Sequence, residues 1–492
     1  MKKLIILLSA ILVLGNSCKT FLSVDETNPN QASAVPANLM LPAALNATAG
    51  YVTQPDNYRF IYEWYGCWSV SGGYSQPTAL TQYKPINSSY QNNWYYAYTN
   101  LQNYDYMEKN SPGDQNKPFR AISKVMKAYN YQYLVDTYGN VPYSEALKTD
   151  QGILKPIYDN QQAIYEDLVV QLDSAINLID TSPADAVEVG ANDIIFGGDM
   201  GLWKKFANTL KLRLLINQSD MSGRGAYISA ALATTASAGY LGAGEGAMSN
   251  PGYLKSAGKM NPFWENYFKQ DDSQQPDGMG YDEAGQDACD FLNSGNDPRK
   301  LRLFAPYSGN LIQGNYFGAV VLNLPNVTSH LGPGLLQGFD MSAPIFTDFE
   351  SLFLQAEAVQ RGLIAGNDSI LYADAVRQSI IYMGGTSADA DTYLSQAGKN
   401  LVNYGASPNK LAAIITQKWL ALNGISPMPI WTDYRRTGLP DFIHFTADPA
   451  TQNPTPPVRL YYPQTEISTN NDNVVAQGTI NLFTSKIFWQ NR

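Results

Sequence analysis

The sequence contains only two histidines, His330 and His444, and three cysteines, Cys18, Cys67 and Cys289. Two histidines far apart in sequence exclude a histidine-rich metal site, and each is better explained as a loop or core residue than as a general base. Besides Cys18, the two remaining cysteines are too few for a disulfide framework or a metal site. A single disulfide bond between Cys67 and Cys289 stays open.

The short motifs of common catalytic sites are absent: there is no GxSxG, no HExxH and no phosphate-binding P-loop. The loop Gly242–Gly246 has the sequence GAGEG, but no strand pattern precedes it, which argues against a dinucleotide site. We therefore expect no enzyme, no catalytic residue and no cofactor. A lipid-anchored glycoside hydrolase is the weaker alternative, since it needs only two carboxylates about 5 to 10 Å apart, which can be distant in sequence.

Positive charge is scarce as well. The 33 basic residues are outnumbered by 43 acidic residues, and the formal net charge is −10. Nucleic acid is not an expected partner, because phosphate binding needs concentrated lysine and arginine. Acidic residues gather at Asp271, Asp272, Asp277, Asp282 and Glu283. Because these residues lack the order of EF-hand ligands, we interpret them as a solvated acidic face and predict no metal; a Ca²⁺ ion held by loop oxygens is the alternative.

Long hydrophobic runs are limited to Leu4–Leu14, which follows two lysines and is too short to span a bilayer as a helix. Small or polar residues and then Cys18 come next, so we predict a signal peptide over residues 1–17 and lipidation of Cys18. Each buried lipid CH₂ contributes about 0.8 kcal/mol to membrane binding. The pattern departs from a usual lipobox at Gly15, where leucine is common. An ordinary secretory signal followed by a chance cysteine is the alternative.

Aromatic residues are abundant, with 33 Tyr, 8 Trp and 18 Phe, while charged residues make up only 15% of the chain. Aromatic rings stack on the apolar faces of sugars, and the amides of Asn and Gln exchange hydrogen bonds with hydroxyls. The composition therefore suits a neutral, hydroxyl-rich ligand or a peptide. The alternative is that tyrosines fill a helical core and extend their hydroxyls to water.

Hydrophobic periodicity indicates a mainly helical chain. Helices are predicted over residues 118–138, 159–179, 199–218, 349–361, 368–382, 409–422 and 431–436. Asp159 is the predicted N-cap of the second, Gly139 the left-handed C-cap of the first, and Pro142 ends that segment. Between residues 239 and 344 the pattern breaks into stretches rich in Gly, Pro and Asn. Long loops of this kind are usually functional.

Several short segments follow one another over nearly the whole chain in the order typical of one family. They are Phe21-Leu22, Asn28-Pro29-Asn30, Asp136–Tyr143, Asn261-Pro262-Phe263, Asn296–Arg299, Phe353–Ala358 with Arg361-Gly362, Gln417-Lys418-Trp419, Trp431–Gly438 and Arg459–Pro463. Together they resemble the SusD/RagB-like outer-membrane lipoproteins, in the nutrient-binding subfamily.

This resemblance implies a mainly α fold, with a tetratricopeptide-like helical scaffold and a large irregular ligand-binding half. We expect a signal peptide over residues 1–17 and one domain over 18–492, with the scaffold at roughly 36–236 and 345–440 and the irregular region at roughly 239–344. The resemblance also implies a lipid-anchored protein of the outer membrane, facing the cell exterior. Its partner would be a SusC-like TonB-dependent transporter, and its ligand an oligosaccharide or, alternatively, a peptide.

Two sets of residues carry the remaining predictions. Trp431, Asp433, Arg435 and Arg436 look catalytic at first sight, but we interpret them as a structural cluster of ion pairs and stacked rings, with Glu357 as a helix–helix anchor. The ligand-binding candidates are aromatic residues near flexible or irregular segments. They are Trp68, Tyr74, Trp94, Trp264, Tyr281 and Tyr316. For any one of them, burial in the core is the alternative.

Overall fold

The computed structural model describes residues 35–490, together with their side chains except that of Asp277. The predicted signal peptide over residues 1–17 and the predicted lipidation site Cys18 lie outside the described residues and stay predictions. Within residues 35–490, every helix is too short or too polar to cross a membrane.

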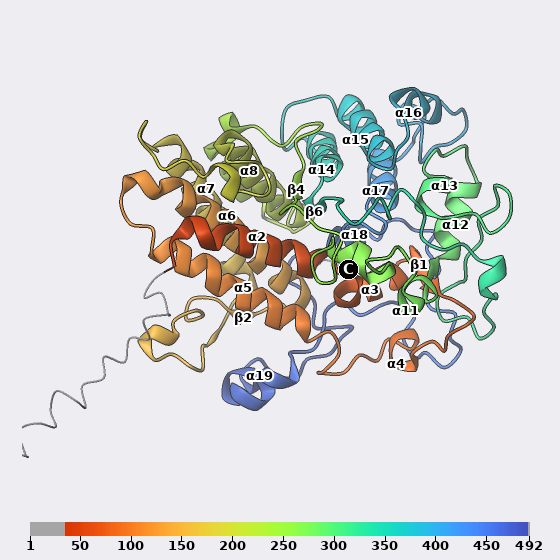
Figure 1. Ribbon diagram of the computed structural model, residues 1–492, viewed down its shortest axis with the longest axis horizontal. Helices are drawn as coiled ribbons and strands as arrows, with labels where there is room; N and C mark the ends of the chain where they lie inside the picture. The colour runs from red at the N-terminus through yellow and green to blue at the C-terminus, as the bar shows by residue number, and fades with distance from the viewer. Residues whose placement is uncertain (1–34, 491–492) are drawn as a thin grey trace, which may run out of the picture.

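The first part of the chain is built of helices, and the long ones among them pack side by side in a layer. The elements are α2 (Ala37–Thr53), α3 (Pro55–Trp64), α4 (Thr78–Thr81), α5 (Asn92–Lys109), α6 (Lys117–Tyr138), α7 (Gln161–Asp180), α8 (Met200–Asn217) and α9 (Gly225–Thr234). The longest, α6, packs between α5 and α7 and also contacts α8, as Figure 1 shows on its left-hand side. Pro118 lies in the first turn of α6, where its missing N–H costs no hydrogen bond.

The second group of helices follows residue 347. It comprises α14 (Asp348–Gln360), α15 (Asp368–Tyr382), α16 (Ser387–Leu394), α17 (Lys410–Ala421), α18 (Pro427–Thr437), α19 (Gln464–Thr469) and α20 (Asn471–Val475). Helix α14 packs against α15 and α17 and also touches α8, so it joins the two groups of helices. Helix α18 contacts α3 and α8 near the centre of the molecule.

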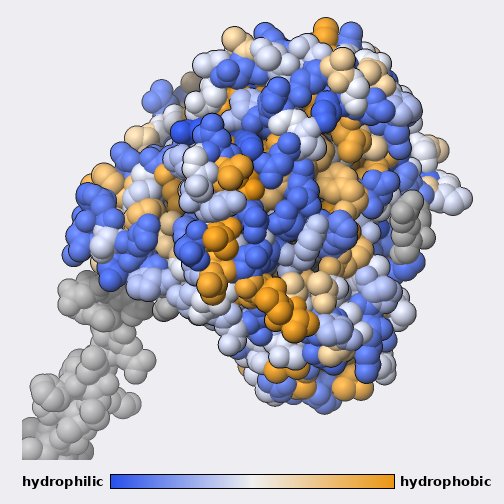
Figure 2. Space-filling view, turned by 90° about the vertical axis from the view of Figure 1, so that its right-hand side faces the viewer, coloured by the Kyte–Doolittle hydropathy of each residue, from blue (hydrophilic) through white to orange (hydrophobic). Residues whose placement is uncertain are grey.

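Short elements dominate the stretch between the two groups of helices. They are β4 (Ala247–Ser249), α10 (Pro262–Tyr267), α11 (Pro276–Met279), β5 (Asp282–Ala284), α12 (Gln286–Asn293), α13 (Lys300–Leu303) and β6 (Ala343–Phe346). The antiparallel strand pairs are β1 (Trp68–Val70) with β5, β4 with β6, and β2 (Val141–Pro142) with β3 (Tyr158–Asp159). Figure 2 shows the face on the right of Figure 1, where hydrophilic side chains are interspersed with hydrophobic ones.

Two predicted helix ends differ in detail. The N-cap of α7 is Asn160, whose side chain accepts hydrogen bonds from the N–H groups of Gln162 and Ala163, so the prediction of Asp159 is wrong by one residue. Asp159 instead belongs to β3. Gly139 follows α6 with φ +78° and ψ −120°, a conformation that glycine tolerates but that lies outside the left-handed helical region predicted for it.

The predicted structural cluster is confirmed. The Arg436 guanidinium lies 2.5 Å and 2.9 Å from the two carboxylate oxygens of Glu357, and 2.9 Å from Asp433. Arg435 stacks over the Trp431 ring, with its Cζ 4.0 Å from the ring centroid. All these side chains are buried, so they link α14 to α18 inside the protein and are not available to a ligand.

Cys67 and Cys289 are both buried free thiols. Burial raises the pKa of each thiol above its usual value, which makes them poor nucleophiles. The possibility of a disulfide bond between them is therefore not realised in this structure.

Candidate ligand-binding cleft

Two of the predicted aromatic residues, Tyr74 and Tyr281, line one cavity of about 490 Å³. Their ring centroids are 5.5 Å apart and the rings meet edge to face at 74°. We call this cavity the tyrosine cleft. Its lining is completed by polar side chains and one glycine: Asp56, Arg59, Glu265, Asn266, Gln275 and Gly278.

The tyrosine cleft is built where the first helical group meets the irregular stretch. Asp56 and Arg59 come from α3, whereas Glu265 and Asn266 come from α10. Tyr281 directly precedes β5, which pairs with β1, and the pairing fixes the position of this ring relative to the loop that carries Tyr74. Neither half of the chain forms the cleft alone.

Tyr74 is held in place by a close backbone approach. Its hydroxyl donates a hydrogen bond of 2.9 Å to the carbonyl oxygen of Pro276. A Cβ atom at Gly280 would lie 2.6 Å from that same oxygen and 2.9 Å from the Tyr74 hydroxyl. Only glycine fits there without displacing the tyrosine, so residue 280 preserves the shape of the cleft.

Arg59 anchors the floor of the cleft through charge pairs. Its guanidinium lies 2.8 Å from Asp282 and 3.2 Å from Asp56, and its Cζ is 5.0 Å from the centroid of the Tyr281 ring. Tyr267 donates a further hydrogen bond of 2.7 Å to Asp282. Burial alone would lower the pKa of Arg59, but Asp282 and its other neighbours raise it above its usual value. Arg59 therefore stays charged and orients Tyr281.

Two buried glutamates, Glu63 and Glu283, lie near this floor, and Glu63 has no hydrogen-bond partner among the described residues. Burial raises the pKa of Glu63 to about 8, against the opposing effect of Arg59. Burial likewise raises the pKa of Glu283 to about 7. His330 Nδ1 lies 3.3 Å from Glu283, and burial lowers the pKa of this imidazole. At neutral pH Glu63 is therefore mostly protonated and His330 mostly neutral, which reduces the cost of burying them.

Trp264 and Tyr316 do not line the tyrosine cleft. Trp264 lies on α10, next to the cleft residue Glu265, but its half-buried ring stacks on Phe268 with centroids 4.2 Å apart. Tyr316 lies apart from the cleft, where its hydroxyl donates a 3.0 Å hydrogen bond to Asp290 and its ring packs against His444. As a ligand contact, Trp264 stays a prediction, whereas Tyr316 lies outside the cavity in which we place the ligand.

Trp68 and Trp94 are packed inside the protein. Trp68 has no exposed surface and stacks on Tyr62 with centroids 4.4 Å apart. Trp94 is 6% exposed and is surrounded by tyrosine rings, including Tyr158. Neither tryptophan presents a ring face to a ligand in this structure, and we leave both out of the cleft.

The acidic residues between 271 and 283 do not form one solvated face. Asp271 and Asp272 are exposed, but Asp282 and Glu283 are buried in β5, so the prediction is wrong for these two. The Asp277 side chain lies outside the described part of the chain. Among the described residues, no group of three or more His, Cys, Asp or Glu side chains is arranged to hold a metal ion.

Arg59 and Gln275 are cleft residues that the sequence-based prediction missed. Arg59 is the one basic residue within the aromatic segment Tyr58–Trp64, and a charge among rings is a signal that the prediction did not use. Its partner Asp282 lies in a strand far along the chain, so the pair is visible only after folding. Gln275 has no local signal, because glutamine is common throughout the sequence.

The chain thus combines a mainly helical fold with a polar, aromatic-lined cavity. Residues 29–463 match the SusD-like family described as "Starch-binding associating with outer membrane". The chain therefore belongs to this outer-membrane-associated SusD-like family of nutrient-binding proteins, and the predicted family is confirmed.

Solved structures agree with this assignment. A chitin-binding protein is similar with 25% identity and a TM-score of 0.75, covering 93% of this chain and 100% of its own. A SusD-like protein from Bacteroides thetaiotaomicron VPI-5482 has 22% identity and a TM-score of 0.71, covering 90% and 95%. A SusD homologue from Bacteroides uniformis ATCC 8492 has 22% identity and a TM-score of 0.74, covering 92% and 99%. The last two show the fold, and the predicted mainly α class is confirmed. The comparison with curated proteins gives no match.

Proposed function

We propose that this protein binds a nutrient oligosaccharide in the tyrosine cleft. The observation that carries the proposal is the meeting of Tyr74 and Tyr281 at one polar cavity of about 490 Å³. Tyrosine rings offer flat apolar faces to sugar rings, while Asn266 and Gln275 offer amide donors and acceptors for hydroxyls. The cavity has the size expected of a small-molecule site, roughly 300–1,000 Å³.

A ligand longer than one sugar fits this part of the surface. A second cavity of about 350 Å³ lies beside the tyrosine cleft and shares Glu265 with it. Tyr253 and Asn46 line this neighbour and supply a further ring and amide. Two adjoining polar cavities suit a chain of sugar units more than a monosaccharide.

The first ligands to test follow from the relatives. The family is described as starch-binding, and one similar protein of solved structure is described as chitin-binding. Malto-oligosaccharides and chito-oligosaccharides therefore head a panel that also contains other glycans and peptides. Binding of a glycan without shortening over time supports the proposal of a binding protein that is not an enzyme. Exclusive binding of peptides would replace the ligand class, and shortening of a bound glycan would replace the protein class with a hydrolase.

Delivery to a membrane partner completes the proposal. We infer that lipidation of Cys18 anchors the protein to the outer membrane, facing the cell exterior, and that it passes its ligand to a SusC-like TonB-dependent transporter. Membership of an outer-membrane-associated family supports this inference. The variant Cys18→Ala should fold but leave the membrane fraction, because the lipid is the proposed anchor. Equal membrane retention of the variant and the unchanged protein would contradict the anchor.

A further inference from the structure

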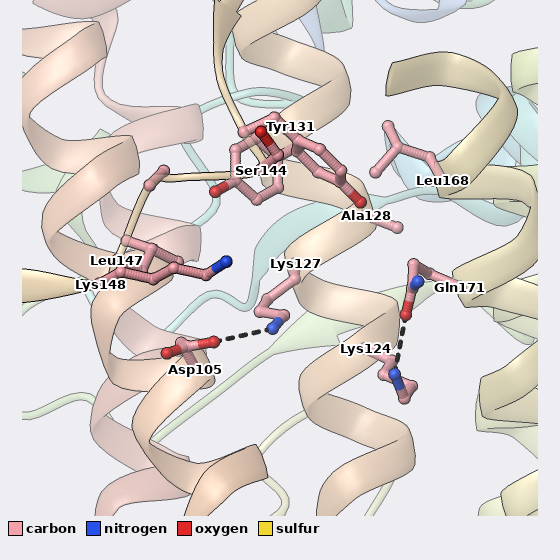
Figure 3. Close-up of a pocket in the computed structure, with 12 residues that line it drawn as sticks. Asp105, Lys124, Lys127, Ala128, Tyr131, Ser144, Leu147, Lys148, Leu168 and Gln171 are labelled. Atoms are coloured by element: carbon pink, nitrogen blue, oxygen red, sulfur yellow. Dashed lines mark hydrogen bonds and ion pairs between the residues drawn. The ribbon is translucent and has the colours of Figure 1, made fainter. Parts of the chain in front are cut away.

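A third polar cavity lies in the first helical group, on elements other than those of the tyrosine cleft and its neighbour. It has a volume of about 240 Å³ and is lined by α5, α6, α7 and the segment that follows β2 (Figure 3). Three of its lining residues are lysines: Lys124, Lys127 and Lys148. This concentration of positive charge stands out in a chain whose net charge is −10.

Two of these lysines already have partners. Lys127 Nζ lies 3.1 Å from Asp105 and 2.8 Å from Glu108, while Lys124 Nζ lies 2.8 Å from Glu108. Lys124 also donates a 2.7 Å hydrogen bond to Gln171, which Figure 3 marks with a dashed line. These pairs hold α5, α6 and α7 together around the opening, so the walls are fixed before any ligand arrives.

Lys148 differs from both. It is half-buried, and it has no ion pair or side-chain hydrogen bond among the residues that the structure describes. In Figure 3 its ammonium group points into the cavity, toward Lys127. Leu147, the preceding residue, has φ +61°, which is uncommon for a residue other than glycine. The cavity therefore contains one ammonium group without a carboxylate of the described residues at ion-pair distance.

The segment that carries Lys148 is itself clamped. Asp159 accepts hydrogen bonds from the N–H groups of Tyr143 and Ser144, at 2.9 Å and 2.8 Å. The Tyr143 hydroxyl donates to Asp167 on α7, and the ring packs edge to face against Tyr131 with centroids 4.6 Å apart. The Tyr131 and Tyr143 rings, the backbone amides of Tyr143 and Ser144 and the Lys148 ammonium group thus surround this cavity. Its volume is smaller than that of a typical small-molecule site, about 300–1,000 Å³.

We propose that this cavity is a second binding site, for a small hydroxyl-bearing carboxylate such as an acidic monosaccharide. Lys148 pairs with the carboxylate, while Gln171 and Ser144 face the hydroxyls and the Tyr131 ring covers one side. The limited volume excludes an oligosaccharide. The site is independent of the tyrosine cleft, because the two cavities share no lining residue.

Isothermal titration calorimetry with glucuronate tests the proposal, with glucose as the neutral control ligand. The unchanged protein should bind glucuronate with a dissociation constant of about 1 mM or below and glucose at least tenfold more weakly. Lys148→Met should weaken glucuronate binding at least tenfold, which corresponds to about 1.4 kcal/mol. The matched control is Lys155→Met, which removes the same charge from an exposed position in the same region and should bind as the unchanged protein does.

Each contrary outcome overturns the site. The proposal fails if glucuronate does not bind, or if glucose binds equally well. It also fails if Lys148→Met binds glucuronate as well as the unchanged protein does, at an unchanged melting temperature. Any of these results would show that the lysine is a solvated surface charge. Equal weakening by Lys155→Met would show only a general charge effect. Tyr281→Ala should leave glucuronate binding unchanged, which separates failure of this site from failure of the proposed oligosaccharide cleft.

Discussion

Buried charges are treated differently in the helical scaffold and beside the tyrosine cleft. In the scaffold, Glu357 on α14 is clamped by Arg436 at 2.5 Å and by Arg361 at 2.7 Å. Asp433 is likewise paired with Lys418 at 2.9 Å. Burial would raise the pKa of Glu357, but these cations hold it well below its usual range. This network fixes the relative positions of α14, α17 and α18.

Beside the cleft, the buried carboxyl group of Glu63 has no hydrogen bond to any described residue. Burying a polar group without a partner costs about 1–3 kcal/mol, so this region is less stable than its packing alone would make it. Proteins usually retain such costs at functional sites. The contrast is therefore between Glu357 in the scaffold, which cations keep ionised, and Glu63 beside the cleft, which burial keeps protonated at neutral pH.

The largest expected effect comes from breaking the scaffold network. Glu357→Gln leaves Arg436 buried beside a neutral amide, and breaking a buried ion pair typically costs about 3–5 kcal/mol. We expect the free energy of unfolding to fall by that amount at neutral pH, measured by urea denaturation. Because the pKa of Glu357 is lowered in the folded state, its contribution is present above its unfolded pKa and is lost as pH falls.

A matched control uses an exposed carboxylate in an ion pair. Asp272→Asn removes the partner of Lys255, whose Nζ lies 2.5 Å away at the surface. Exposed pairs contribute little because water and salt screen them, so this variant should unfold almost as the unchanged protein does. If the two variants lost equal stability, the buried network would not be the distinguishing feature of the scaffold.

The second effect has the opposite dependence on pH. The pKa of Glu63 is raised from 4.5 to about 8, so the folded protein binds a proton that the unfolded chain releases between these values. Stability should therefore fall as pH rises through this window, by up to about 1.4 kcal/mol per pH unit. Glu63→Gln should remove the contribution of Glu63 to this slope and leave that of Glu283, whose pKa is raised to about 7. The stability of the variant should exceed that of the unchanged protein above about pH 8.

Urea denaturation at about pH 5 and about pH 8.5 measures this difference. Glu265→Gln, a substitution of the same kind at a half-buried cleft residue, is the control and should keep the slope of the unchanged protein. Parallel pH profiles for Glu63→Gln and the unchanged protein would mean that Glu63 is ionised in the folded state.

The smallest expected effect is that of salt on the proposed ligand. Ring stacking and hydrogen bonds between neutral groups do not depend on charge, whereas the Debye length falls from about 10 Å at 0.1 M to about 3 Å at 1 M salt. The affinity for a neutral oligosaccharide should change little over this range in calorimetric titrations. A steep loss of affinity would instead assign binding to the charges of Arg59 and Asp56.

Local sequence patterns predicted the scaffold better than the cleft. The helices α6 and α15 follow from apolar periodicity and from Pro118 and Asp368 at their starts, because these signals act within a few residues. The cleft depends on the pairing of β1 with β5 and on contacts between α3 and β5 across distant parts of the chain. Such pairings leave no local pattern.

The same reason explains the mixed outcome for the aromatic candidates. Tyr74 and Tyr281 lie in loops that the fold brings together at the cavity. Trp68 was expected at a flexible loop, but it is buried by Tyr62 and by close packing against Gly424, a residue from the far end of the chain. Sequence alone identified rings near irregular segments, whereas long-range packing decided which of them are exposed.

The most direct test of the account is calorimetric titration of the best-binding oligosaccharide into the unchanged protein, Tyr281→Ala and Tyr316→Ala. Tyr281 belongs to the tyrosine cleft, and Tyr316 is the matched tyrosine outside it, with 36% of its surface exposed. We predict that Tyr281→Ala lowers the affinity by about 2 kcal/mol, the size of an aromatic hot spot, at an unchanged melting temperature. Tyr316→Ala should bind as the unchanged protein does. Full affinity in Tyr281→Ala, or an equal loss in both variants, would contradict the assignment of the cleft.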